Sequence, residues 1–262
     1  MIIDLIGKFL PESNRFERIW KIAQVDFKSR YYNNRLGVYW ALIFPLFKLL
    51  CYYTVFTIIS PNTPKNFALF IFSGLLIWMM FAECTKRSLT LINRKKYLMQ
   101  NIQFNHFDLF ISHVITVIMG FNYNVIAYFI FSLFGHVYLG FNALFFPVIL
   151  LTVILYSYSV SIILATLSGF FEDIKHLWDM IILAGFWGSG IFYETEKITN
   201  IAPIIMYLNP FLGIIENTRN CILYNESPNF VLLNYNLMIA IILTIFASNF
   251  YKRKSHKILE NL

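Results

Sequence analysis

Three basic residues gather just before the first long apolar stretch of the sequence. Lys28, Arg30 and Arg35 carry positive charge in this short region, and an arginine guanidinium can hold two phosphate oxygens through parallel hydrogen bonds. We therefore interpret the three residues as a site for a lipid-borne phosphate. A second interpretation stays open, in which they only fix the orientation of the following helix and contact ordinary anionic lipid.

The sequence carries no recognisable catalytic motif. Its one Gly-Lys pair, Gly7-Lys8, is not followed by Ser or Thr, so no phosphate-binding loop of the G-x-x-x-x-G-K-[ST] type is present. The cysteines and histidines lack metal-ligand spacing, and we expect neither a metal site nor a cofactor in this chain. Glu172, Asp173 and His176 form the only group that would suit a membrane-bound enzyme.

Three charged residues interrupt otherwise apolar stretches, namely Lys48, Glu83 and Asp179. A charged side chain at the centre of a bilayer costs about 2.5–3.5 kcal/mol on insertion scales, so such residues pair inside the protein, reach toward water or serve function. Pairing within the helix bundle and lining of a polar conduit both stay open for these three.

Composition assigns the chain to the integral membrane proteins. Hydrophobic residues make up 58% of the 262 residues and charged residues only 13%, whereas a soluble domain is about a quarter charged. Six apolar stretches are each near or above the length that a bilayer requires, at residues 36–59, 67–85, 108–135, 141–170, 177–193 and 230–251. We expect an all-α membrane domain over residues 1–262, with a cytoplasmic arm (1–35), a bundle of six transmembrane helices (36–251) and a cytoplasmic tail (252–262).

The distribution of Lys and Arg predicts the orientation. With both termini in the cytoplasm, 17 of these residues fall on the cytoplasmic side and three on the outer side, as the positive-inside rule requires. The net charge of +7 is therefore a topology signal, and it does not call for a nucleic-acid partner.

Two polar segments on the cytoplasmic side contain helical apolar patterns. Phe16, Ile19, Trp20, Ala23 and Phe27 recur at helical spacing among basic residues, which predicts an amphipathic helix in the membrane interface. A simple anchor and a helix that also meets a partner or lipid phosphates both stay open.

Residues 87–107 mix large apolar and basic side chains and are too polar to span a membrane. We expect a cytoplasmic helix whose apolar face docks on a partner, through Arg94, Lys95, Leu98 and Ile102. A solvated loop is the alternative.

The outer segment, residues 194–229, is apolar but interrupted by Pro203 and by Asn209-Pro210. Proline breaks helices and restricts the residue before it. Two short helices that dip into the outer leaflet and return satisfy both features, because irregular backbone at that depth must be covered by protein or water.

The ordered motifs resemble those of type-2 ABC exporter membrane subunits that secrete O-antigen, capsular polysaccharide and teichoic acid. The stretch from Asp26 through Lys28, Arg30, Tyr31, Leu36, Gly37 and Trp40 to Pro45 matches that family's pattern before the first helix, and Asn209-Pro210 with Arg219 matches its pattern before the last. Ile191-Phe192-Tyr193 echoes the end of its fifth helix. Val25, Asn105-His106 and Gly190 depart from the family pattern.

The resemblance implies a homodimer in the bacterial cytoplasmic membrane, driven by two copies of a separate ATPase subunit that binds ATP and Mg. Its substrate would be a lipid-linked glycan, and aromatic rings, 19% of the residues, can stack on sugars. We expect Trp187, Phe192, Tyr193, Ile204 and Phe211 to close the conduit on the outer side; the alternative is that this outer segment only holds the two copies of the chain together. An ABC exporter of a drug or small lipid, and a polyprenol-dependent transferase, remain alternatives.

Overall fold

The computed structural model describes residues 15–31, 35–59, 64–101, 105–195 and 204–261. The described residues form helices joined by turns and short irregular stretches and contain no strand, as expected from the sequence. Its elements are α2 (Arg15–Tyr31), η1 (Gly37–Tyr39), α3 (Trp40–Ile59), α4 (Phe67–Ser88), α5 (Leu91–Asn101), α6 (Phe107–Phe134), η2 (Phe141–Phe145), α7 (Phe146–Ser168), α8 (Ile174–Gly188), α10 (Ile205–Leu208), α11 (Pro210–Ile222) and α12 (Phe230–Asn261).

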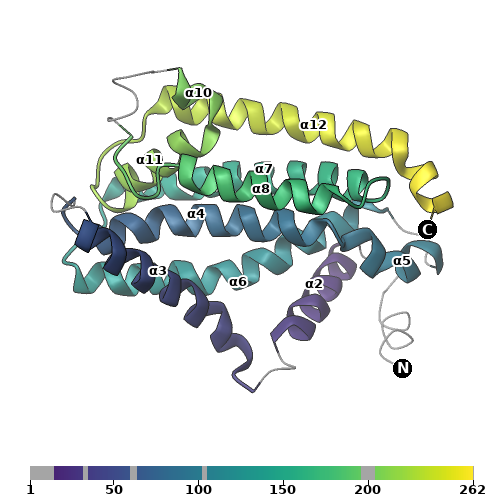
Figure 1. Ribbon diagram of the computed structural model, residues 1–262, viewed down its shortest axis with the longest axis horizontal. Coiled ribbons are helices and arrows are strands. Elements are labelled where there is room, and N and C mark those ends of the chain that lie inside the picture. Colours follow the sequence, from purple (N-terminus) through teal and green to yellow (C-terminus); the bar gives the residue numbers. More distant parts are fainter. Residues whose placement is uncertain (1–14, 32–34, 60–63, 102–104, 196–203, 262) are drawn as a thin grey trace.

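Helix α4 forms the centre of the bundle. It packs against α3, α6, α7, α8 and α11, and 78% of its most apolar stretch is buried. A helix that is apolar on all sides belongs in a protein core or in a membrane. In Figure 1, α4 runs between α6 and α8, and α7 and α12 run nearly parallel to it.

Five helices are long and apolar enough to cross a membrane: α3 with η1, α4, α6, α7 with η2, and α12. The predicted span over residues 177–193 is not among them, because α8 has 15 residues and is about 22 Å long at the α-helical rise. The helix ends at Gly188, and Gly190 adopts a positive φ of 79°. Glycine tolerates this left-handed backbone, which stops a helix.

Helix α3 is the least covered of the long helices. Only 11% of its most apolar stretch is buried, and large side chains such as Phe47 and Ile58 are exposed along it. In Figure 1 it runs obliquely to the other long helices and lies beside α4 and α6 near its C-terminal end. Lipid or a further protein chain must therefore cover most of α3 in a membrane.

Helix α2 confirms the predicted helix before the first span. Of its predicted apolar stripe, Ile19 and Ala23 are buried, whereas Phe16 is 74% exposed and Trp20 is also exposed. Asp108, fully buried in the first turn of α6, pairs with the guanidinium groups of Arg15 and Arg18 at 2.8 and 2.7 Å. One side of the amphipathic helix is thus fixed to α6, and the other stays available to the membrane interface.

A second hydrophobic core lies at the α5 end of the bundle. It joins α2, α5, the start of α6, and the C-terminal parts of α7 and α12. The buried residues that we call the second core are Ile22, Leu91, Ile92, Leu98, Met99, Leu109, Phe110, Ile162, Ala165, Ala247 and Tyr251.

Candidate functional site

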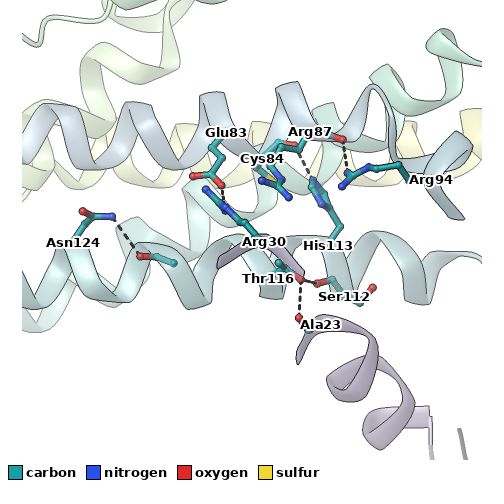
Figure 2. A network of polar contacts seen from close by, with 11 residues as sticks. Ala23, Arg30, Glu83, Cys84, Arg87, Arg94, Ser112, His113, Thr116 and Asn124 are labelled. Carbon is teal, nitrogen blue, oxygen red and sulfur yellow. Dashed lines mark hydrogen bonds and ion pairs between the residues drawn. The ribbon is translucent and has the colours of Figure 1, made fainter. Parts of the chain in front are cut away.

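The C-terminal turn of α2 meets α4 and α6 in a polar junction (Figure 2). Arg30 extends from α2 and forms an ion pair with Glu83 of α4. On the same junction, His113 of α6 contacts the Cys84 carbonyl oxygen at 2.8 Å, and Thr116 of α6 donates to the Ala23 carbonyl oxygen at 3.3 Å. These contacts hold the end of α2 against the bundle and so fix the position of Arg30.

Tyr31 lies beside Arg30 and is buried. Gly120 of α6 makes room for it, because a Cβ atom at that position would lie 3.0 Å from the Tyr31 hydroxyl oxygen. Burial raises the pKa of the Tyr31 phenol above its ordinary value, and the neighbouring Arg30 charge opposes this in part. The phenol therefore stays neutral and able to donate a hydrogen bond at physiological pH.

Two cavities meet at the Arg30–Glu83 pair. One, of about 290 Å³, lies between α3, α4 and α6, and the other, of about 400 Å³, lies between α3, α4 and α8. Both are lined by Arg30, Phe44, Met79 and Glu83. We call the combined space the α3 crevice, since α3 borders its whole length.

The α3 crevice gathers the charged residues of the membrane helices. Lys86 of α4 pairs with Asp179 of α8 at 2.7 Å, so Glu83 and Asp179 both have basic partners on other elements. The amino group of Lys48 lies 4.6 Å from the Phe44 ring centre and forms no ion pair among the described residues. Three cations and two carboxylates thus line a largely apolar crevice, which leaves one positive charge in excess.

The structure separates the three basic residues that were predicted to form one phosphate site. Only Arg30 lines the α3 crevice. Lys28 lies two positions earlier, about 200° around the helix, and borders a different groove with Tyr123 of α6. Arg35 is exposed beyond the end of α2. The three residues therefore do not line one cavity, and the other cations of the crevice are Lys48 and Lys86.

The residues predicted to dock on a partner fall on different faces of α5. Leu98 is only 8% exposed and belongs to the second core, so it does not form a docking face. Lys95 pairs with Asp26 of α2, and Ile102 lies outside the described residues. Arg94 is exposed, as is the side of α5 that presents Lys96, Tyr97 and Gln100.

Three of the five residues predicted to close the outer side come together. Phe192 stacks on Phe56 of α3 with ring centres 4.3 Å apart, its ring lies 5.4 Å from that of Trp187, and the Tyr193 hydroxyl donates to the Trp187 carbonyl oxygen. Phe211 instead packs on a separate group of rings in α4 and α7, and Ile204 is 64% exposed.

Arg219 and Asn209 explain the motif before the last helix. Asn209 caps α11 by accepting from the Phe211 N–H and donates to the Gly188 carbonyl oxygen at 2.9 Å. The predicted break at this point is confirmed, since α10 ends just before it and α11 begins with Pro210. Arg219 is 3% exposed and joins α11 to α4 and to the turn after α8 through several main-chain carbonyls.

The acidic group considered for an enzyme, Glu172 with Asp173 and His176, lies exposed at the start of α8. Main-chain carbonyls of the two acidic residues accept from the first N–H groups of that helix. Across the described ranges, no three His, Cys, Asp or Glu side chains are placed to hold a metal ion.

Five apolar helices of membrane-spanning length, packed around a central helix, define a multi-pass membrane protein. The sequence pattern of the ABC-2 type transporter family matches residues 17–223, and the chain belongs to that family.

The chain is similar to O-antigen export system permease proteins named RfbA. It is 24% identical to one from Klebsiella pneumoniae over 249 residues, which is 94% of this chain and 95% of that protein. It is 21% identical to one from Myxococcus xanthus over 243 residues, which is 92% of this chain and 94% of that protein.

Proposed function

We propose that this chain is the channel-forming subunit of an ATP-driven exporter that moves a lipid-linked polysaccharide across the bacterial cytoplasmic membrane. Two copies form the conduit, and two copies of a separate ATPase subunit, which holds ATP and Mg, drive it. The names of the similar permeases support the polysaccharide, and membership of the ABC-2 family supports an ATPase partner.

The α3 crevice is the proposed binding site for the lipid-linked substrate. A polyprenyl diphosphate joins an anionic head to an apolar tail, and the crevice joins cations to apolar walls that include Phe44 and Met79. Arg30 and Lys48 offer the charge-assisted contacts that phosphate oxygens accept. The poorly covered α3 leaves the tail in contact with the bilayer.

Six crossings with both termini in the cytoplasm agree best with the charge distribution. In this topology α8 is the fifth crossing and is completed by the chain after Gly188, while α10 and α11 dip into the outer leaflet. The apolar sides of α3 and α8 present Phe47, Leu183 and Trp187, and we assign this surface to the second copy of the chain.

The exposed side of α5, with Arg94 at its edge, is the proposed contact for the ATPase. Trp187, Phe192 and Tyr193 are the proposed outer closure of the conduit. Phe192 stacks on Phe56 and on Trp187, whose carbonyl oxygen accepts from Tyr193, and these contacts join α8 and its following turn to α3.

The experiment uses the complex with its ATPase in nanodiscs and a synthetic polyprenyl diphosphate as the probe. Arg30→Gln and Lys48→Gln should each raise the probe concentration that gives half-maximal stimulation of ATP hydrolysis by about tenfold or more. This is the effect expected from the loss of one charged hydrogen bond. Lys28→Gln is the matched control, since it removes the same charge from another face of α2.

Equal stimulation of the wild type and the Arg30 and Lys48 variants would overturn the crevice as the phosphate site. A wild-type complex that responds to an amphiphilic drug and ignores the polyprenyl diphosphate would favour the drug exporter instead.

A further inference from the structure

A groove of about 440 Å³ lies between α2 and α6. Within it Phe27 of α2 stacks on Tyr123 of α6, with ring centres 6.4 Å apart. We call it the α2–α6 groove, and its lining also includes Gln24, Lys28, Asn122 and Ile126. None of these residues lines the α3 crevice, so the groove is a separate site on α2.

The groove lies at the level where the chain enters the membrane. The end of α2 contacts the entry to α3, since a Cβ atom at Gly37 would lie 3.8 Å from the Tyr31 carbonyl oxygen. Helix α3, one of the membrane-spanning helices, begins at Trp40, and tryptophan is enriched at the membrane surface. Lys28, in the last turn of α2, is therefore within reach of lipid headgroups.

Three polar side chains of the groove have no partner in the described part of the chain. The amides of Gln24 and Asn122 and the ammonium group of Lys28 form no hydrogen bond or ion pair with other described residues. Asn122 is exposed on a helix that spans the membrane. A polar group that faces lipid costs free energy unless it is hydrogen-bonded, so this position indicates a ligand that carries both polar and apolar parts.

An exposed apolar stripe continues from the groove along α6. Its residues recur at helical spacing and are 39% to 78% exposed, namely Tyr123, Ile126, Ile130 and Phe134. From Tyr123 to Phe134 the stripe is about 16 Å long at the α-helical rise. This is close to half of the roughly 30 Å hydrocarbon core, so the stripe fits one acyl chain of a single leaflet.

The charge of the groove selects the kind of lipid. Among the described residues that line it, Lys28 is the one charged residue, and none is a carboxylate. The phosphate of an anionic lipid gains a charge-assisted hydrogen bond from Lys28. A choline headgroup would instead bring its own cation beside Lys28, with no carboxylate in the lining to balance it.

We propose that the α2–α6 groove binds an anionic diacyl phospholipid of the bilayer. Lys28 donates to the phosphate, the Gln24 and Asn122 amides donate to the glycerol ester oxygens, and one acyl chain lies along the stripe. This lipid is a ligand of the protein and not its cargo, because the substrate phosphates are assigned to the α3 crevice. Its contacts add to those of Asp108 and Thr116, which already hold α2 against α6.

The test measures lipid binding to the purified full chain in detergent by native mass spectrometry. The probes are phosphatidylglycerol and phosphatidylcholine with the same acyl chains. Phosphatidylglycerol should bind the wild type more tightly, and Lys28→Gln should raise its Kd by about tenfold, as expected for the loss of one charged hydrogen bond. Asn122→Leu should weaken the binding of both lipids, because they share the ester oxygens.

Lys21→Gln is the matched control. It removes the same charge from an exposed position on α2 that does not line the groove, and it should leave the Kd unchanged. Equal effects of Lys21→Gln and Lys28→Gln would show unspecific attraction to a basic helix and would overturn the site, as would equal binding of the two lipids.

Two further results would assign the groove to another occupant and so overturn the proposal. Displacement of phosphatidylglycerol by inorganic phosphate would make it a site for free phosphate. A disulfide between two copies of Ile126→Cys, made in a Cys51→Ser background to remove the exposed native cysteine, would assign the stripe to a second copy of the chain.

Lys48→Gln separates this inference from the proposed function. The change lies in the α3 crevice and should leave phosphatidylglycerol binding unchanged. If the polyprenyl diphosphate fails to stimulate the wild-type complex while the Lys28-dependent lipid preference persists, the proposed substrate is wrong and the groove remains a lipid site. If the polyprenyl diphosphate displaces phosphatidylglycerol, the substrate occupies the groove and the separate lipid site is wrong.

Discussion

Replacing Arg219 by methionine removes the group that joins three segments of the protein. The guanidinium donates to the Ile191 carbonyl oxygen at 2.8 Å, to that of Tyr193 at 3.4 Å and to that of Phe70 at 3.3 Å, and it lies over the Phe70 ring. Methionine keeps much of the side-chain length and none of the donors. We expect the turn after α8 to detach from α4.

The size of the effect follows from the carbonyls that lose their donor. The Phe70 carbonyl oxygen retains the Ser73 hydroxyl as a donor at 2.9 Å, so Ile191 and Tyr193 carry the loss. Each unsatisfied buried group costs about 1–3 kcal/mol, and removing a buried charge returns part of that cost. The net destabilisation is about 2–4 kcal/mol, which lowers the melting temperature by about 5–15 °C in a chain of this size.

The assay is thermal unfolding of the purified chain in one detergent, followed by circular dichroism. Arg253→Met is the control, because Arg253 is exposed near the end of α12 and should melt like the wild type. Arg219→Lys keeps the charge but replaces the forked guanidinium with a single nitrogen, so it should lose most of the same stability. An Arg219→Met variant that melts with the wild type would show that these hydrogen bonds do not hold the outer segment.

The remaining predictions concern other elements of the bundle. Asp108→Asn should weaken the attachment of α2 by about 1–3 kcal/mol and accelerate hydrogen exchange in α2; unchanged exchange would contradict this. Gly190→Ala should destabilise by about 1–2 kcal/mol through its left-handed backbone and its contact with Leu212, with Gly188→Ala as the control, and equal melting of the two would refute it. Leu98→Asp should lower the melting temperature because the residue is buried. Lys96→Glu, at an exposed position, should keep the melting temperature and reduce the stimulation of ATP hydrolysis by the polyprenyl diphosphate; the reverse pattern would place Leu98 on the docking face.

The sequence by itself was sufficient to predict the helices that cross the membrane. An apolar stretch of about 20 residues has few alternatives in lipid, since every backbone group must be paired within the segment. The break at Asn209-Pro210 was predictable for a similar reason, because proline lacks the N–H that a continuing helix uses. The predicted span over residues 177–193 is not among the five long helices, because the apolar composition continues through residues 188–190 while glycine ends α8.

The position of the α3 crevice was decided only by tertiary structure. Lys28 and Arg30 have the same charge in the sequence, yet the angle at which α2 packs on α6 directs Lys28 to a groove beside Tyr123 and Arg30 to Glu83. The sequence pattern shows that α5 has an apolar face but does not show which element covers it. Leu98 was therefore predicted to contact a partner, whereas packing places it in the second core.

The pairing of Glu83 and Asp179 with basic residues of other elements likewise depends on atoms distant in the sequence. Hydrophobic burial is non-directional and roughly proportional to area, so a local pattern predicts it well. Ion pairs and hydrogen bonds need particular atoms within about 3 Å, and only the packing of the helices brings such atoms together.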